Sequence, residues 1–101
     1  MIVHVLKFSA KPGKEKTVHK IIRSCMSVLK DEAHPGTSFH SFRDAANKRQ
    51  FIQISTFESR EAEERFESCL ELRNYLARLL HVIDGGMDYN KVESFEFFQA
   101  R

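Results

Sequence analysis

The sequence predicts an α+β fold of the ferredoxin-like kind, with the order β-α-β-β-α-β and a four-stranded antiparallel sheet. Along the chain, segments in which every second residue is apolar, as in strands, alternate with segments whose apolar residues recur at helical spacing. Three pairs of chain breakers, Pro12-Gly13, Pro35-Gly36 and Gly85-Gly86, divide these segments. The 101 residues are 42% hydrophobic and 30% charged, which is typical of one soluble globular domain covering residues 1–101.

The first two elements are a strand over residues 2–8 and a helix after Pro12-Gly13. Both faces of the strand are mostly apolar, which favours a central place in the sheet. The helix ends at His34-Pro35-Gly36, because proline disfavours helix in the residue before it and glycine accepts a left-handed turn. Its apolar residues recur at steps of three and four: Val18, Ile21, Ile22, Cys25, Val28, Leu29 and Ala33.

A hairpin follows, with strands over residues 37–44 and 49–58 around the polar turn 45–48. Ser59 is a suitable N-cap for the next helix, whose first turn is acidic, as the helix dipole favours. We interpret the charged residues from Glu61 to Glu67 as a solvated helix face rather than a carboxylate pair.

The apolar stripe from Ala62 to Ile83 predicts a second helix, with a possible break near Ser68. Asp84-Gly85-Gly86 is expected to end this helix. A final strand is expected over residues 91–98, where the alternation returns and places Phe95 and Phe97 on one face.

Composition excludes several classes of function. No apolar run reaches the roughly 20 residues that span a bilayer, and the first residues do not resemble a signal peptide, so we expect a cytoplasmic protein without membrane partners. The net charge is +2 and forms no basic stripe, which argues against nucleic acid as a partner. The two cysteines, Cys25 and Cys69, are expected to be reduced and buried.

The predicted sheet has apolar residues on both faces, although helices can cover only one of them. Phe39 and Phe42 fall on opposite faces of the second strand, and Phe97 and Phe98 on opposite faces of the last. An open apolar sheet face rarely stays in water, so we expect a homodimer in which two sheets pack together.

Local motifs accompany this pattern. They are Lys11-Pro12-Gly13-Lys14 after the first strand, Pro35-Gly36 before a strand ending Phe42-Arg43-Asp44, and the stretch from Phe51 to Ser59. On these motifs the chain resembles the antibiotic-biosynthesis monooxygenase domains of the dimeric α/β-barrel superfamily. The opening from His4 to Phe8 is also similar to the stress-response A/B-barrel branch, which ranks second.

The resemblance implies a cavity between sheet and helices. It also implies a reaction without metal or flavin, in which a deprotonated quinol or polyphenol passes electrons to O₂. Haem-degrading relatives use polar or iron-binding groups at positions that fall near Leu6, Phe66 and Leu76 here, so haem degradation is not expected. The family's usual Trp before Glu-Ser is Phe57. These four residues, Leu6, Phe57, Phe66 and Leu76, are the expected substrate pocket.

His4, His40 and Tyr75 are the candidate catalytic residues. An imidazole can accept a proton at neutral pH, and His4 shares its strand face with Leu6. The alternative for His4 is a partly buried histidine bonded to a neighbour, and His40 faces either the pocket or the dimer seam. Tyr75 either holds a substrate oxygen or is a core residue whose hydroxyl reaches water.

The other histidines, His19, His34 and His81, are expected at the surface or at a helix end. No pair of histidines or cysteines has a metal-binding spacing, so neither a metal nor another cofactor is expected. The resemblance therefore predicts a cofactor-independent monooxygenase of small aromatic or quinol-like compounds. The alternative is a non-catalytic dimeric barrel that binds a small apolar ligand or acts in a stress response.

Overall fold

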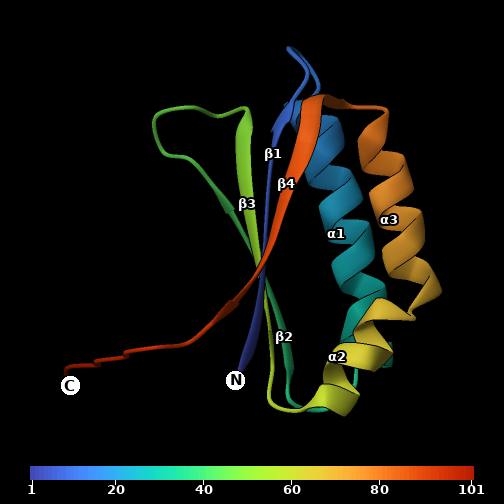
Figure 1. The fold of residues 1–101 in the computed structure, drawn as a ribbon. Helices are drawn as coiled ribbons and strands as arrows, with labels where there is room; N and C mark the ends of the chain where they lie inside the picture. Colours follow the sequence, from blue (N-terminus) through green and yellow to red (C-terminus); the bar gives the residue numbers. More distant parts are fainter.

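The computed structural model describes residues 1–101 and has the predicted order of elements, with the second helical segment divided in two (Figure 1). The strands are β1 (Ile2–Ala10), β2 (Thr37–Arg43), β3 (Gln50–Phe57) and β4 (Ile83–Glu93). The helices are α1 (Glu15–Glu32), α2 (Arg60–Glu67) and α3 (Leu70–Leu80). The α+β ferredoxin-like fold with a four-stranded antiparallel sheet is confirmed. No helix combines the length and the apolar character needed to cross a membrane.

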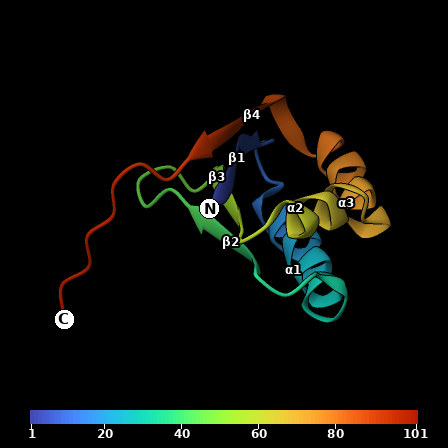
Figure 2. The ribbon, with the colours of Figure 1, turned by 60° about the horizontal axis from the view of Figure 1, so that its bottom comes forward.

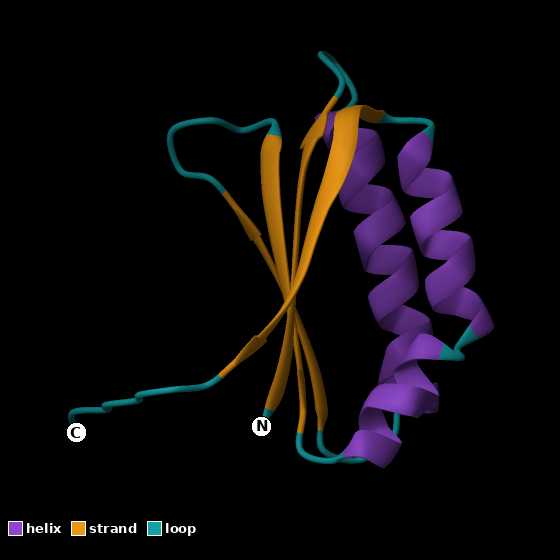
Figure 3. Cartoon of the chain, viewed as in Figure 1, coloured by secondary structure: helices purple, strands orange, loops and turns teal.

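The sheet has the strand order β2-β3-β1-β4, so β1 is central as predicted. All three helices lie on one face, which we call the inner face, and the outer face carries none (Figures 2 and 3). The core lies between the inner face and α1 and α3. It takes from α1 the residues Val18, Ile21, Ile22, Cys25 and Leu29 of the predicted stripe.

The second helical segment breaks at Ser68-Cys69, where the prediction allowed a break. Cys69 has extended backbone angles (φ −68°, ψ 122°), which ends the helical geometry between α2 and α3. At the start of α2, the Ser59 hydroxyl accepts a hydrogen bond from the Ala62 amide at 3.1 Å, as expected of an N-cap. The break lets α2 turn away from α3 and cross the lower end of the sheet (Figure 1).

The predicted boundary between the second helix and the last strand is wrong. The helix ends at Leu80, and Gly85-Gly86 lies inside β4 rather than ending a helix. Lys7 of β1 pairs with Asp88, but Ser9, two residues on, pairs with Asp84, so β4 has two extra residues at this point. Glycine suits such a bulge because it accepts positive φ, here +76° at Gly85.

The predicted end of the last strand is also wrong, because β4 ends at Glu93. Its partner strand runs out there: Glu93 pairs with Ile2, the first residue of β1. The remaining residues extend away from the sheet (Figure 1). The side chains of Phe95, Phe97 and Phe98 are therefore more than 80% exposed, and they do not belong to either face of the sheet.

Candidate functional site

A cavity of about 340 Å³ lies between the inner face of the sheet and the helices α2 and α3. This volume is within the range of small-molecule sites. Eight of its twelve lining residues are hydrophobic. The complete lining is His4, Leu6, Phe39, Gln53, Ser55, Phe66, Glu67, Leu72, Tyr75, Leu76, Met87 and Tyr89.

The strand register explains how polar side chains reach this cavity. Residues directly opposite each other on antiparallel strands share a face, and alternate residues along one strand share it too. His4 lies opposite Ser55 of β3 and Lys91 of β4. The next row on the same face pairs Leu6 with Gln53 and Tyr89. Two neighbouring rows of the sheet thus supply the polar wall of the cavity.

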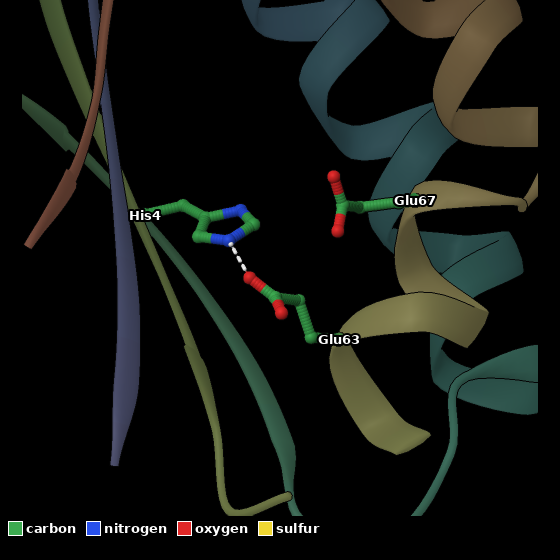
Figure 4. A group of neighbouring side chains, drawn as sticks. All are labelled: His4, Glu63 and Glu67. Carbon is green, nitrogen blue, oxygen red and sulfur yellow. Dashed lines mark hydrogen bonds and ion pairs between the residues drawn. The ribbon is translucent and has the colours of Figure 1, made fainter. Parts of the chain in front are cut away.

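His4 is a buried polar residue of this wall, with only 4% of its surface exposed. Its Nε2 lies 2.7 Å from Oε2 of Glu63 on α2, as the dashed line in Figure 4 marks. Its Nδ1 lies 2.8 Å from the hydroxyl oxygen of Tyr89 on β4. The ring also packs edge-on against Phe57 at a centroid distance of 4.8 Å. Both ring nitrogens therefore have partners, and the ring is held in one orientation.

The surroundings of His4 shift the pKa values of both of its partners, Glu63 and Tyr89. The hydrogen bond from His4 lowers the pKa of Glu63 below its ordinary value of 4.5, and the positive charge of Lys91 lowers it further. Burial raises the pKa of Tyr89 above its ordinary value of 10, with smaller contributions from Glu67 and Glu63. Glu63 is therefore a carboxylate and Tyr89 a neutral phenol at neutral pH.

Two carboxylates and one imidazole converge at this end of the cavity. The potential ligand atoms of His4, Glu63 and Glu67 all lie within 4.8 Å of one another, a spacing that one metal ion can bridge (Figure 4). The ammonium of Lys91 lies 3.5 Å from both carboxylates, and Glu67 is the main cause of its raised pKa. The side-chain cation next to these carboxylates is thus Lys91.

Tyr75 forms part of the far wall of the cavity, and burial raises its pKa. The interpretation that its hydroxyl reaches water is wrong, because the residue is only 1% exposed. Neither this hydroxyl nor Oε1 of Gln53 forms a hydrogen bond of ordinary length and angle, although the Gln53 side chain lies near enough to lower the pKa of Tyr75 in part. Nε2 of Gln53 donates to the Ser41 hydroxyl at 2.8 Å, which orients the amide.

The predicted site residues separate into two groups. His4, Tyr75, Leu6, Phe66 and Leu76 all line the cavity. Phe57 does not line it.

His40 lies outside the cavity. It faces the outer side of the sheet, opposite Ile54 and stacked on Phe42 at a centroid distance of 3.9 Å. His40 was expected to face either the pocket or the dimer seam, and in the structure it does not face the pocket.

The site also includes residues that the sequence did not indicate. The interpretation of Glu61–Glu67 as a solvated face is wrong for Glu63, whose side chain is only 13% exposed and bonded to His4. Tyr89 and Lys91 were missed because the predicted strand began at residue 91 and gave no pairing with His4. The available signal was the pair Glu63 and Glu67, four residues apart and so on one side of a helix.

Fold and site together define an α+β domain with a mostly apolar cavity next to a buried imidazole. The model of the antibiotic biosynthesis monooxygenase family matches residues 1–78. The chain belongs to the antibiotic biosynthesis monooxygenase family.

Solved structures share the fold at low sequence identity. One is a variant of SnoaB, a cofactor-independent oxygenase from Streptomyces nogalater, with a TM-score of 0.81, 10% identity and coverage of 98% of this chain and 97% of that one. Another is Rv0793 from Mycobacterium tuberculosis, with a TM-score of 0.81, 12% identity and coverage of 97% of this chain and 98% of that one. A third is PA3566 from Pseudomonas aeruginosa, with a TM-score of 0.76, 14% identity and coverage of 94% of each chain. No match was found among curated proteins.

Proposed function

We propose that the protein is a cofactor-independent monooxygenase that oxidises a small aromatic or quinol-like compound in the cavity. The observation that carries the proposal is His4, a buried imidazole in the wall of a mostly apolar cavity. Membership of the monooxygenase family and the likeness to a cofactor-independent oxygenase support it. The aromatic side chains Phe39 and Phe66 offer flat surfaces to an aromatic ring.

The proposed reaction begins with loss of a hydroxyl proton from the substrate to a protein base. The resulting anion is electron-rich enough to reduce O₂. With an anthrone-type compound, the ring CH₂ group becomes a carbonyl, one oxygen atom of O₂ enters the product and the other leaves as water. The substrate carbon supplies all four electrons, so the step requires no external reductant.

Oxygen uptake with an anthrone-type compound tests this proposal. We expect one O₂ consumed per substrate, with a rate that a chelator does not change. Replacement His4→Ala should lower the rate by about 10²–10⁴-fold, as removal of a general base does. If no phenolic or anthrone-type compound is consumed, the alternative of a non-catalytic ligand-binding barrel replaces the enzyme.

We also propose that the protein is a homodimer joined through the outer face of the sheet. No helix covers this face, and it carries a group of partly exposed apolar side chains: Val3, Val5, Phe42, Ile52, Ile54 and Val92. A second copy would remove these side chains from water.

A further inference from the structure

We propose that Glu63, His4 and Tyr89 form a proton relay, in which Tyr89 receives the substrate proton and passes its own to Nδ1 of His4. This inference rests on the proposed function. It adds a positioning residue, Glu63, and a residue that contacts substrate, Tyr89. It also restricts the substrate to compounds whose reacting group is a phenolic or enolic hydroxyl.

The ring of His4 has one tautomer that satisfies both of its partners. A carboxylate accepts hydrogen bonds and cannot donate them, so Nε2 carries the proton that Glu63 receives at 2.7 Å. In a neutral imidazole the other nitrogen, Nδ1, is then an acceptor. The hydroxyl of Tyr89, 2.8 Å away, must therefore donate to it. Because Glu63 fixes the proton on Nε2, the free electron pair of the His4 ring is on Nδ1 and faces the hydroxyl of Tyr89.

Tyr89 is the member of this group that a substrate can reach. His4 is 4% exposed and both of its nitrogens are engaged, whereas Tyr89 is 49% exposed and lines the same cavity. The hydroxyl oxygen of Tyr89 donates its only proton to His4 and retains lone pairs that can accept another. A substrate hydroxyl can therefore donate to Tyr89 while Tyr89 donates to His4.

The step moves two protons and no electron pairs between molecules. The substrate O–H bond breaks and a new O–H bond forms on Tyr89. At the same time, the original O–H bond of Tyr89 breaks and an N–H bond forms at Nδ1 of His4. The substrate keeps the electron pair as an oxyanion, and the carboxylate of Glu63 stabilises the resulting imidazolium.

A metal ion on the same side chains is the competing explanation. It would need Nε2 of His4 as a ligand in place of its bond to Glu63, and it would displace the ammonium of Lys91. The hydrogen bonds present and the nearby ammonium favour the relay.

Nitrogen NMR of the His4 ring tests the tautomer without substrate. We expect a protonated Nε2 and an unprotonated Nδ1 in the wild-type protein. Glu63→Gln can donate to Nε2 through its amide and should shift the population toward the Nδ1-protonated form. Glu64→Gln, an exposed neighbour on the same helix, should leave the ring unchanged. A wild-type ring protonated at Nδ1, or a stoichiometric change at Nε2 when Zn²⁺ is added, would overturn the relay.

Kinetics with an anthrone-type compound test the part played by Tyr89. Tyr89→Phe keeps the ring but removes the hydroxyl, and we expect kcat to fall by about 10²-fold with a smaller change in KM. Wild-type kcat in Tyr89→Phe would show that protons reach His4 directly and would overturn the relay. If the tautomer is as expected but no compound consumes O₂, the proposed function fails while the assignment of Glu63 as the positioning residue stands.

Discussion

At the scale of single residues, the partners of His4 determine what its ring can do. An imidazole bonded to a carboxylate on one side and to a phenol on the other has a defined donor and a defined acceptor. The same ring exposed to water would exchange between both tautomers. The contacts with Glu63 at 2.7 Å and Tyr89 at 2.8 Å therefore carry the chemical interpretation of the cavity.

Tyr75 gives a prediction at this scale. Its hydroxyl is buried without a hydrogen bond of ordinary length and angle, so its removal deletes at most a weak contact with Gln53. We expect Tyr75→Phe to leave the free energy of unfolding unchanged or to raise it by up to about 1 kcal/mol. Urea denaturation provides the measurement, and a loss of more than 1 kcal/mol would show that the hydroxyl is bonded.

Cys25 gives a second prediction. Burial, together with the charge of Glu71, raises the pKa of its thiol to about 12. Since the thiolate is the reactive form, Cys25 in the folded protein should resist iodoacetamide at pH 8, while the partly buried Cys69 reacts first. Mass spectrometry after brief labelling measures both sites. Equal labelling of the two cysteines before addition of urea would contradict this expectation.

At the scale of elements, the short helix α2 places Glu63 next to the sheet, and the N-cap residue Ser59 stabilises this helix. Ser59→Ala removes the bond to the Ala62 amide and should cost about 1 kcal/mol of unfolding free energy. The control is Ser27→Ala in the interior of α1, where an exposed serine has no capping role and alanine is the better helix former. Thermal or urea denaturation should show a lower unfolding free energy for Ser59→Ala than for Ser27→Ala. Equal effects would show that the cap contributes nothing.

The contact between α2 and β1 also predicts a dependence on pH. The folded protein lowers the pKa of Glu63 below its value of 4.5 in the unfolded chain. The stabilisation is therefore complete above about pH 4.5 and is lost as the pH falls through the lower, folded value. The difference in unfolding free energy between the wild type and Glu63→Gln should shrink as the pH is lowered from about 5 toward about 3, because protonation of Glu63 removes the charge that binds His4. A difference that stays constant over this range would contradict the assignment.

The elements show which parts of the fold the sequence can predict. The strand β1, the helix α1 and the hairpin follow from uninterrupted periodic patterns. The last strand does not, because the bulge at Gly85-Gly86 breaks its alternation and resembles a helix end. The aromatic residues at positions 95, 97 and 98 then resemble a strand, although they have no partner strand to pair with.

In the candidate site, only His4 of the three residues His4, Glu63 and Tyr89 could be placed from the sequence. Alternation along β1 placed His4 on the same face as Leu6, so the imidazole could be found from the sequence. Its partners could not, because Tyr89 reaches it through a register that depends on the bulge, and Glu63 through the angle at which α2 crosses the sheet. Such contacts are set by the packing of elements and not by local spacing.

At the scale of the whole molecule, the uncovered sheet face predicts a homodimer. Sedimentation at micromolar concentration should give twice the chain mass of 11.8 kDa, with an interface of order 2,000 Å². Ile54→Lys places a charge in the middle of the outer face and should favour the monomer. Leu80→Lys places the same charge on the exposed side of α3, on the helical side, and should leave the dimer intact. A wild-type monomer would overturn the sheet-to-sheet prediction.

The main claim is that His4, in the wall of the cavity, is the final base, which takes a proton from Tyr89 as Tyr89 takes one from the substrate. The most direct test compares oxygen uptake with an anthrone-type compound in His4→Ala and His40→Ala, since only the first histidine lines the cavity. The account predicts that His4→Ala loses about 10²–10⁴-fold in rate and that His40→Ala keeps most of the wild-type rate. Wild-type turnover in folded His4→Ala would contradict the claim.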